Sequence, residues 1–247
     1  MIRFILKKNR NYVVVLILLS VFISGCGLFS DADEKFYFSE TQQPDDLEYQ
    51  YIALASEMHS IKPCYLIHPN SLRKGAFNAV GNQVTLLRSQ CFYSVAFNST
   101  DPKLCNEVRS ASTLFLSGAE FDKESCRRSA KTKGGFSYDL DVPKIVSLAG
   151  YSEKEINDFL VSEGRFSTTD VARNYRQDNS TIYWGEVRRN LLHSQEFFDS
   201  IDHLPHFGKD ADKAKMSNIS WNARPQRQRT PPEQRTKSAP EIRIPAQ

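Results

Sequence analysis

The groups with the clearest chemistry in this chain of 247 residues are five cysteine thiols. A thiol can form a disulfide with a second thiol, or it can accept a lipid as a single nucleophile. No two of these cysteines are separated by two residues, so the Cys-x-x-Cys pattern of thioredoxin-like redox centres and zinc knuckles does not occur. Four of the thiols lie in the middle of the chain and one lies near its start: Cys64, Cys91, Cys105 and Cys126, and Cys26.

The residues before Cys26 have the layout of a secretory signal. Four basic residues, Arg3, Lys7, Lys8 and Arg10, precede an apolar run over residues 13–23. This run is too short to span a bilayer, for which about 20 apolar residues are needed. We therefore expect the chain to be exported, although an uncleaved membrane anchor or an ordinary signal peptide remains an alternative.

The tetrapeptide Ile23-Ser24-Gly25-Cys26 at the end of this run resembles the lipobox of bacterial lipoproteins. The resemblance covers residues 1–27 and implies processing, not a particular activity. It implies that a signal peptidase removes residues 1–25. It also implies that Cys26 becomes a lipid-modified N-terminus, with palmitate or similar acyl chains that hold it in a membrane. In enteric bacteria an aspartate after the cysteine usually retains a lipoprotein at the inner membrane. Because Gly27 stands there instead, the resemblance favours the outer membrane, facing the periplasm.

The four remaining cysteines predict two disulfides, because the compartment outside the inner membrane is oxidising. Cys64 and Cys91 lie on either side of an irregular connection, and Cys105 and Cys126 lie on either side of a turn near Gly118. We therefore expect the pairs Cys64–Cys91 and Cys105–Cys126. The alternatives are Cys91–Cys105 with Cys64–Cys126, or free buried thiols.

Apolar residues recur at helical spacing along most of the chain, and no convincing period-two alternation appears. Capping residues, prolines and glycines mark the helix ends; Ser152 and Glu155, for example, form a capping box. The sequence predicts helices over about 47–58, 84–97, 101–108, 121–131, 141–149, 152–163 and 184–204, with another opening at 167–170.

This pattern predicts an all-α fold: a single helical domain over 47–207 with two disulfides. A flexible tether over 26–46 precedes the domain, and a disordered basic tail over 208–247 follows it. The tail is rich in proline and has few apolar residues, so burial would not offset the entropy of ordering it.

The tail is also the basic part of the chain. Residues 209–247 hold nine basic and four acidic side chains, whereas the mature chain as a whole is close to neutral. Guanidinium groups bind phosphates and carboxylates well. We expect the tail arginines to bind an anionic envelope polymer, lipid or acidic protein, or else only to keep the chain soluble; we expect no nucleic-acid partner. These arginines are Arg224, Arg227, Arg229, Arg235 and Arg243.

One dense cluster of potential ligands or catalytic groups occurs, formed by Asp199, Asp202, His203 and His206. Neither a zinc-protease motif, a Gly-x-Ser-x-Gly elbow nor a phosphate-binding loop accompanies it. A solvated helix end with histidines near the helix dipole explains the cluster better. We therefore predict no catalytic residue, metal or cofactor.

The sequence favours a non-enzymatic lipoprotein of the bacterial cell envelope, bound to the membrane through its lipid and to an envelope protein through its helical domain. An assembly such as a secretion or pilus apparatus would use a part of this kind. The alternatives are an envelope hydrolase with a site built from scattered residues, and a lipoprotein inhibitor of a secreted enzyme.

Overall fold

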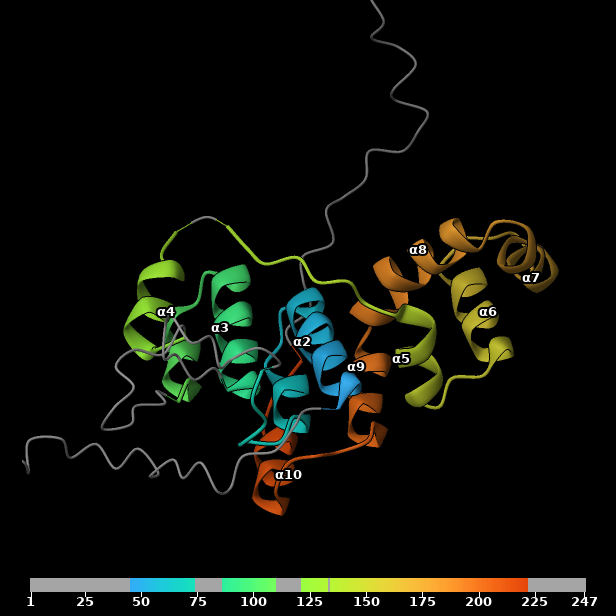
Figure 1. The fold of residues 1–247 in the computed structure, drawn as a ribbon. Helices are drawn as coiled ribbons and strands as arrows, with labels where there is room; N and C mark the ends of the chain where they lie inside the picture. The colour runs from blue at the N-terminus through green and yellow to red at the C-terminus, as the bar shows by residue number, and fades with distance from the viewer. Residues whose placement is uncertain (1–44, 74–85, 110–120, 133, 222–247) are drawn as a thin grey trace, which may run out of the picture. The chain divides into compact units, whose positions relative to one another are not determined.

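The structure is a computed structural model, and it describes residues 45–73, 86–109, 121–132 and 134–221. These residues form an all-α fold, as predicted (Figure 1). Within the described ranges the only extended pairing is an isolated antiparallel bridge between Leu72 and Leu86. The predicted signal peptide, lipidation site and arginine-rich end lie outside these ranges.

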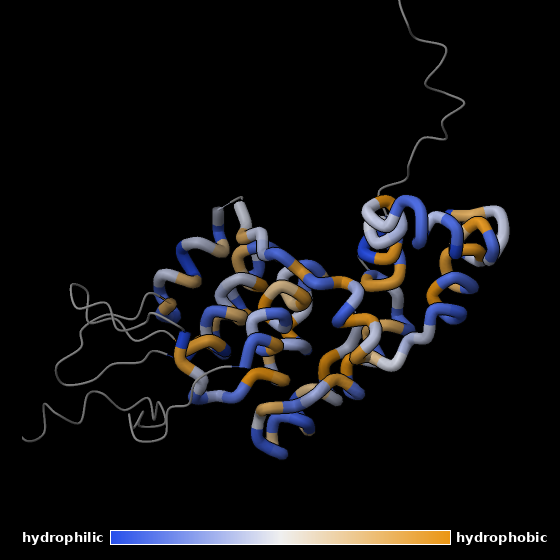
Figure 2. The backbone as a smooth tube through the Cα atoms, turned by 45° about the vertical axis from the view of Figure 1, so that its right-hand side comes forward, coloured by the Kyte–Doolittle hydropathy of each residue, from blue (hydrophilic) through white to orange (hydrophobic). Residues whose placement is uncertain are grey.

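Helix α2 (Asp46–Met58) begins at a capping box. The Asp45 carboxylate accepts a hydrogen bond from the Leu47 amide at 2.7 Å, and the Glu48 carboxylate accepts one from the Asp45 amide at 2.8 Å. The helix packs against α3 (Leu87–Ser99) and is buried on several faces; its Tyr51 hydroxyl donates a hydrogen bond to the Pro205 carbonyl at 2.7 Å. Figure 2 shows apolar and polar residues in turn along the helices of the described chain.

Three short elements surround this helix pair: the 3-10 helices η3 (Lys62–Leu66) and η4 (Pro102–Glu107), and helix α4 (Lys123–Ser129). Both predicted disulfides are confirmed. Cys64–Cys91 joins η3 to α3, and Cys105–Cys126 joins η4 to α4. All four cysteines are buried, so each bridge lies inside the packed helices.

An extended segment follows α4 and leads to α5 (Val142–Leu148). The Asp141 amide at the end of this segment donates a hydrogen bond to the side-chain oxygen of Gln50 in α2, at 2.8 Å. The segment therefore passes along α3 and reaches the N-terminal half of α2 (Figure 1).

The helices group into two compact units. Of the described residues, unit 1 comprises those between Asp45 and Leu148 together with Ile201–Ile219, and unit 2 comprises Ala149–Ser200 with Ser220 and Trp221. In unit 2, helices α6 (Glu153–Ser162), α7 (Thr169–Asp178) and α8 (Ser180–Asn190) pack on one another. This local packing is the physical reason for the division.

Unit 2 has its own polar and aromatic interior. The Tyr183 hydroxyl donates a hydrogen bond to the buried Asn157 side chain at 2.8 Å, and burial raises the pKa of Tyr183 to about 12. The Phe166 ring stacks on Tyr183, with centroids 6.2 Å apart. Arg176 pairs with Glu153 at 3.1 Å, so α6 and α7 are also held together by charge.

The helix predicted over 184–204 is broken into four parts. After α8 come η5 (Leu191–His193), α9 (Gln195–Ser200) and η6 (Ile201–His203). The break between η5 and α9 is due to Ser194, which has an extended backbone and whose hydroxyl accepts a hydrogen bond from the Phe197 amide at 3.1 Å. A serine that satisfies a free amide in this way starts a new helix, although the apolar spacing continues through it.

The predicted start of the disordered tail at residue 208 is wrong. Residues Asp210–Ser217 form helix α10, which packs against η3 and buries Asp212 and Met216. The sequence shows few apolar residues there, and the decisive partner of Asp212 is Arg88, 124 residues away. The chain is therefore structured in unit 1 up to Ile219.

Candidate functional site

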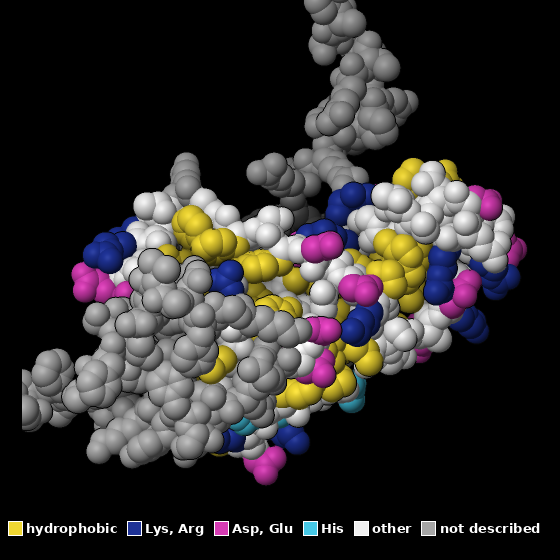
Figure 3. Space-filling model, viewed as in Figure 1, with side chains coloured by type: hydrophobic (Ala, Val, Ile, Leu, Met, Phe, Trp, Pro, Cys, Tyr) yellow, Lys and Arg dark blue, Asp and Glu magenta, His cyan; other side chains and the backbone are white. Residues whose placement is uncertain are grey.

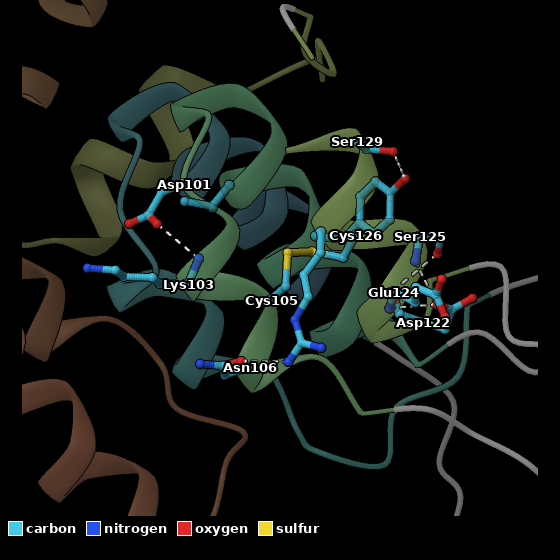
Figure 4. The surroundings of a disulfide bond; sticks show 12 residues. Asp101, Lys103, Cys105, Asn106, Asp122, Glu124, Ser125, Cys126 and Ser129 are labelled. Atoms are coloured by element: carbon cyan, nitrogen blue, oxygen red, sulfur yellow. Dashed lines mark hydrogen bonds between the residues drawn. A yellow bond between two sulfur atoms is a disulfide. The ribbon is translucent and has the colours of Figure 1, made fainter. Parts of the chain in front are cut away.

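The Cys105–Cys126 disulfide joins η4 to α4, two elements that are too short to be stable as isolated helices. Each is capped by an aspartate: Asp101 accepts from the Lys103 amide at 2.9 Å, and Asp122 accepts from the Ser125 amide at 2.7 Å (Figure 4). The aspartates order the first turns, and the disulfide holds the two elements against each other.

An aromatic face lies next to this disulfide. We define the aromatic face as the rings of Tyr93, Phe97, Phe136 and Tyr138. The Phe136 centroid lies 5.4 Å from that of Phe97, 5.9 Å from that of Tyr93 and 6.1 Å from that of Tyr138. Phe136 is 37% exposed, whereas most large apolar side chains of unit 1 are buried. Figure 3 shows hydrophobic side chains reaching the surface over α3 and α4.

The backbone beneath Phe136 is held on both sides by one asparagine. The Asn98 side-chain oxygen accepts a hydrogen bond from the Phe136 amide at 2.7 Å, and the Asn98 side-chain nitrogen donates one to the Phe136 carbonyl at 3.0 Å. Gly134 and Gly135 allow this close approach, since a Cβ at Gly134 would come within 2.5 Å of the Phe97 ring and one at Gly135 within 2.6 Å of Asn98. The exposed ring is therefore held in a defined position.

Two hydroxyl contacts fix the neighbouring tyrosines. The Tyr93 hydroxyl lies 2.6 Å from that of Ser129 in α4, and the Tyr138 hydroxyl lies 2.6 Å from that of Ser94 in α3. These contacts connect the aromatic face to α4 and to α3.

A second cluster surrounds the buried guanidinium of Arg88. Its Nε donates to the Ile67 carbonyl at 2.8 Å, and one Nη donates to the Asp212 carboxylate at 2.8 Å. The side chains of Arg88 and Asp212 are only 9% and 8% exposed, so this is a buried ion pair. Burial alone would raise the pKa of Asp212, but the hydrogen bond and charge of Arg88 hold that pKa below its usual range.

The ring of Tyr65 lies between two cations in this cluster. The Lys215 ammonium lies 5.7 Å from the ring centroid, and the Arg88 guanidinium carbon lies 5.9 Å from it. The Tyr65 hydroxyl donates to Glu107 at 3.1 Å, and burial, together with this carboxylate, raises the pKa of the tyrosine. The Tyr65 ring thus attaches α10 to η3, and the ion pair attaches α10 to α3.

Two half-buried histidines of unit 1 lie in the same electrostatic environment. Burial lowers the pKa of His68, and the Arg88 and Lys209 charges lower it further against the opposing effect of Glu48. Burial and the Lys213 charge lower the pKa of His206. The Asn70 amide donates to Nδ1 of His68 at 3.1 Å, which requires that nitrogen to be unprotonated.

These lowered pKa values predict acid sensitivity. The unfolded chain, with histidine pKa values near 6.5, binds more protons than the folded one between the lowered pKa values and about 6.5. The stabilisation is present above that range and is lost as the pH falls through it. We expect the thermal midpoint, followed by circular dichroism, to be a few degrees lower at pH 5 than at pH 7.5.

His206→Asn should reduce this pH dependence. An equal pH dependence in the parent and the variant would contradict the assignment.

Two of the four residues in the cluster that the sequence analysis weighed, Asp199 and Asp202, have other partners in the structure. Asp199 belongs to unit 2, where it accepts a hydrogen bond from Gln195 at 2.7 Å. Asp202 in unit 1 pairs instead with the buried Lys62 at 3.1 Å. Among the residues that the structure describes, no group of three or more histidine, cysteine or acidic side chains could hold a metal ion.

The sequence reasoning missed Arg88, Asp212 and Phe136. Arg88 could have been recognised as buried, because it stands at the start of a helix with several apolar residues and a buried arginine needs a partner. Gly134-Gly135 before an aromatic residue was a weak signal for Phe136. No local signal marks Asp212, whose neighbours are all charged or small.

Over the described ranges, none of the helices combines the length and apolarity that crossing a bilayer would take. Comparison with known protein families, curated proteins and solved structures gave no match to this chain. The function must therefore be inferred from its own residues.

Proposed function

We propose that this chain is a lipid-anchored, non-enzymatic part of a bacterial envelope assembly, attached through Cys26 and presenting unit 1 to another envelope protein. The observation that carries the proposal is the pair of buried disulfides, Cys64–Cys91 and Cys105–Cys126. Structural disulfides are typical of exported proteins, which agrees with the secretory signal and the lipobox-like tetrapeptide before Cys26.

The arrangement of polar groups favours an interaction role over hydrolysis. The buried charged groups of unit 1 are used in the structure itself: Glu48 accepts hydrogen bonds from the His68 amide and the Ser71 hydroxyl, and Arg88 pairs with Asp212. The buried Lys62 pairs with Asp202. Side chains that satisfy one another in this way stabilise a scaffold, which favours a role in which another protein binds the surface of unit 1.

The first test of this proposal is the acceptor thiol. Cys26→Ser is expected to abolish incorporation of a fatty-acid analogue, and to release the protein from the membrane fraction or leave it as unprocessed precursor. Labelling and fractionation of cells that express the parent and the variant measure both effects. Labelling that persists in Cys26→Ser would remove the basis for the anchor.

The second test concerns the partner. Crosslinking in intact cells, followed by capture from envelope membranes, should recover the same envelope protein with the parent chain in repeated experiments. Cys26→Ser should lose it if attachment to the membrane is needed to meet the partner. A hydrolase would instead release products from cell-wall material, and detection of such an activity in the purified chain would contradict the proposal.

A further inference from the structure

We propose that the aromatic face, together with the basic end of α4, is a contact surface for lipid headgroups, which lays unit 1 on the membrane that carries its anchor. This inference deepens the proposed function and depends on it for the location of the protein.

The first argument is the state of the Phe136 ring. It remains 37% exposed although Asn98 holds its backbone from both sides and three other rings surround it. The Asn98 bonds hold the backbone of this residue in place, and the contacts with the rings of Phe97 and Tyr93 position its side chain. Its exposure keeps an apolar side chain available for a partner.

The second argument is charge. The last turn of α4 and the residues after it expose Arg127, Arg128 and Lys131, and the chain leads from Lys131 directly to Gly134 and Phe136. Figure 3 shows Lys and Arg side chains close to the hydrophobic patch. Aromatic rings beside lysine and arginine are the composition that membrane interfaces favour, and anionic headgroups attract basic segments.

The third argument is the path of the chain. The described chain begins at Asp45, just before α2, and the aromatic segment reaches this part of α2 through the Asp141–Gln50 hydrogen bond. From Cys26 to Asp45 the chain could span roughly 65 Å if fully extended. An anchor at Cys26 would therefore keep the aromatic face within reach of the bilayer at high effective concentration.

The small extent of the face favours lipid over protein as the occupant. A stable protein interface buries about 1,200–2,000 Å² in total, and one exposed ring with two half-buried neighbours is a small part of that. A lipid surface needs no matching shape, and weak contacts suffice when an anchor supplies most of the affinity.

The test uses the mature chain with Cys26→Ser, produced with its disulfides, so that no lipid contributes. Co-flotation with vesicles of phosphatidylethanolamine and phosphatidylglycerol measures binding. We expect the partition coefficient to fall about fivefold in Phe136→Ser, because the ring no longer inserts, and to be retained in Phe136→Trp. Arg127→Gln, Arg128→Gln and Lys131→Gln together should reduce the part of the binding that requires phosphatidylglycerol and that high salt weakens, in the mature chain and equally in the chain that ends after Trp221.

Ile182→Ser in α8 is the matched control, because Ile182 is 46% exposed and lies in unit 2. Equal partitioning of Phe136→Ser and the parent, or no partitioning of the parent, would overturn the inference. Concentration-dependent self-association that Phe136→Ser removes, without vesicle binding, would assign the face to a second copy and also overturn it. Because the tested chain carries no lipid, these results are independent of the fatty-acid labelling that tests the anchor.

Discussion

Replacing Arg88 by methionine is expected to lower the free energy of unfolding of unit 1 by about 3–5 kcal/mol. The substitution leaves the Asp212 carboxylate buried without its cation, and it leaves the Ile67 carbonyl without the Arg88 donor. Methionine fills much of the same volume, so the loss arises mainly from unpaired polar groups rather than from a cavity. A decrease of about 10 °C in the thermal midpoint should follow.

Two comparisons make this result specific. Asp212→Asn should cost less than Arg88→Met, because the guanidinium keeps its bonds to backbone carbonyls. Arg128→Met is the matched surface control: Arg128 is 71% exposed and pairs with Glu124 at 3.5 Å, so its loss should cost less than about 1 kcal/mol. Similar midpoints for Arg88→Met and Arg128→Met would show that the buried pair does not stabilise the fold.

Truncation provides an independent measure of the same cluster. A chain that ends after Trp221 keeps α10 and should melt like the parent. A chain that ends after Phe207 lacks α10, and therefore loses the Asp212 carboxylate and the buried Met216. The shorter chain should lose about as much stability as Arg88→Met does, or more. Equal melting of the two truncations would mean that α10 contributes nothing to unit 1.

Removing either disulfide is expected to cost about 3 kcal/mol, and removing both should cost roughly twice that if the effects add. The bridged cysteines are separated by 27 and 21 residues, so each bridge closes a loop of moderate length in the unfolded chain. Paired alanine substitutions, Cys64→Ala with Cys91→Ala and Cys105→Ala with Cys126→Ala, avoid leaving an unpaired thiol. Thermal midpoints under non-reducing conditions measure each cost.

The bridge between η4 and α4 has a further consequence. Because Ser129 in α4 contacts Tyr93 of the aromatic face, loss of Cys105–Cys126 should also weaken vesicle binding, whereas loss of Cys64–Cys91 should affect it less. Peptide mapping without reduction should recover the two bridges in the freshly isolated protein. Four free thiols in that protein would contradict both the bridges and their predicted stabilisation.

The basic C-terminal residues are proposed to bind anionic partners. Arg224, Arg227 and the arginines after them lie outside the described residues, whereas α10 belongs to unit 1. The chain that ends after Trp221 therefore separates the stabilising contribution of α10 from anion binding by the arginines after it. It should keep the stability that α10 provides and lose any anion binding that the tail arginines contribute.

The sequence by itself determined the features that depend on neighbouring residues. The capping residues Asp101 and Ser152, the turns and the helical spacing of apolar residues predicted most helices of the described chain, because a cap or a turn acts over three or four residues. The disulfide pairs were also predictable, since each joins two helical segments that are adjacent along the chain.

Only the tertiary structure decided the features that depend on distant residues. Arg88 and Asp212 are 124 residues apart in the sequence. Their pairing stabilises a packed helix, α10, where the composition predicted disorder. The exposure of Phe136 depends on Asn98, 38 residues earlier. The division into two units likewise follows from which helices pack together. Burial and ion pairing depend on distance in space, and a local pattern in the sequence does not contain that distance.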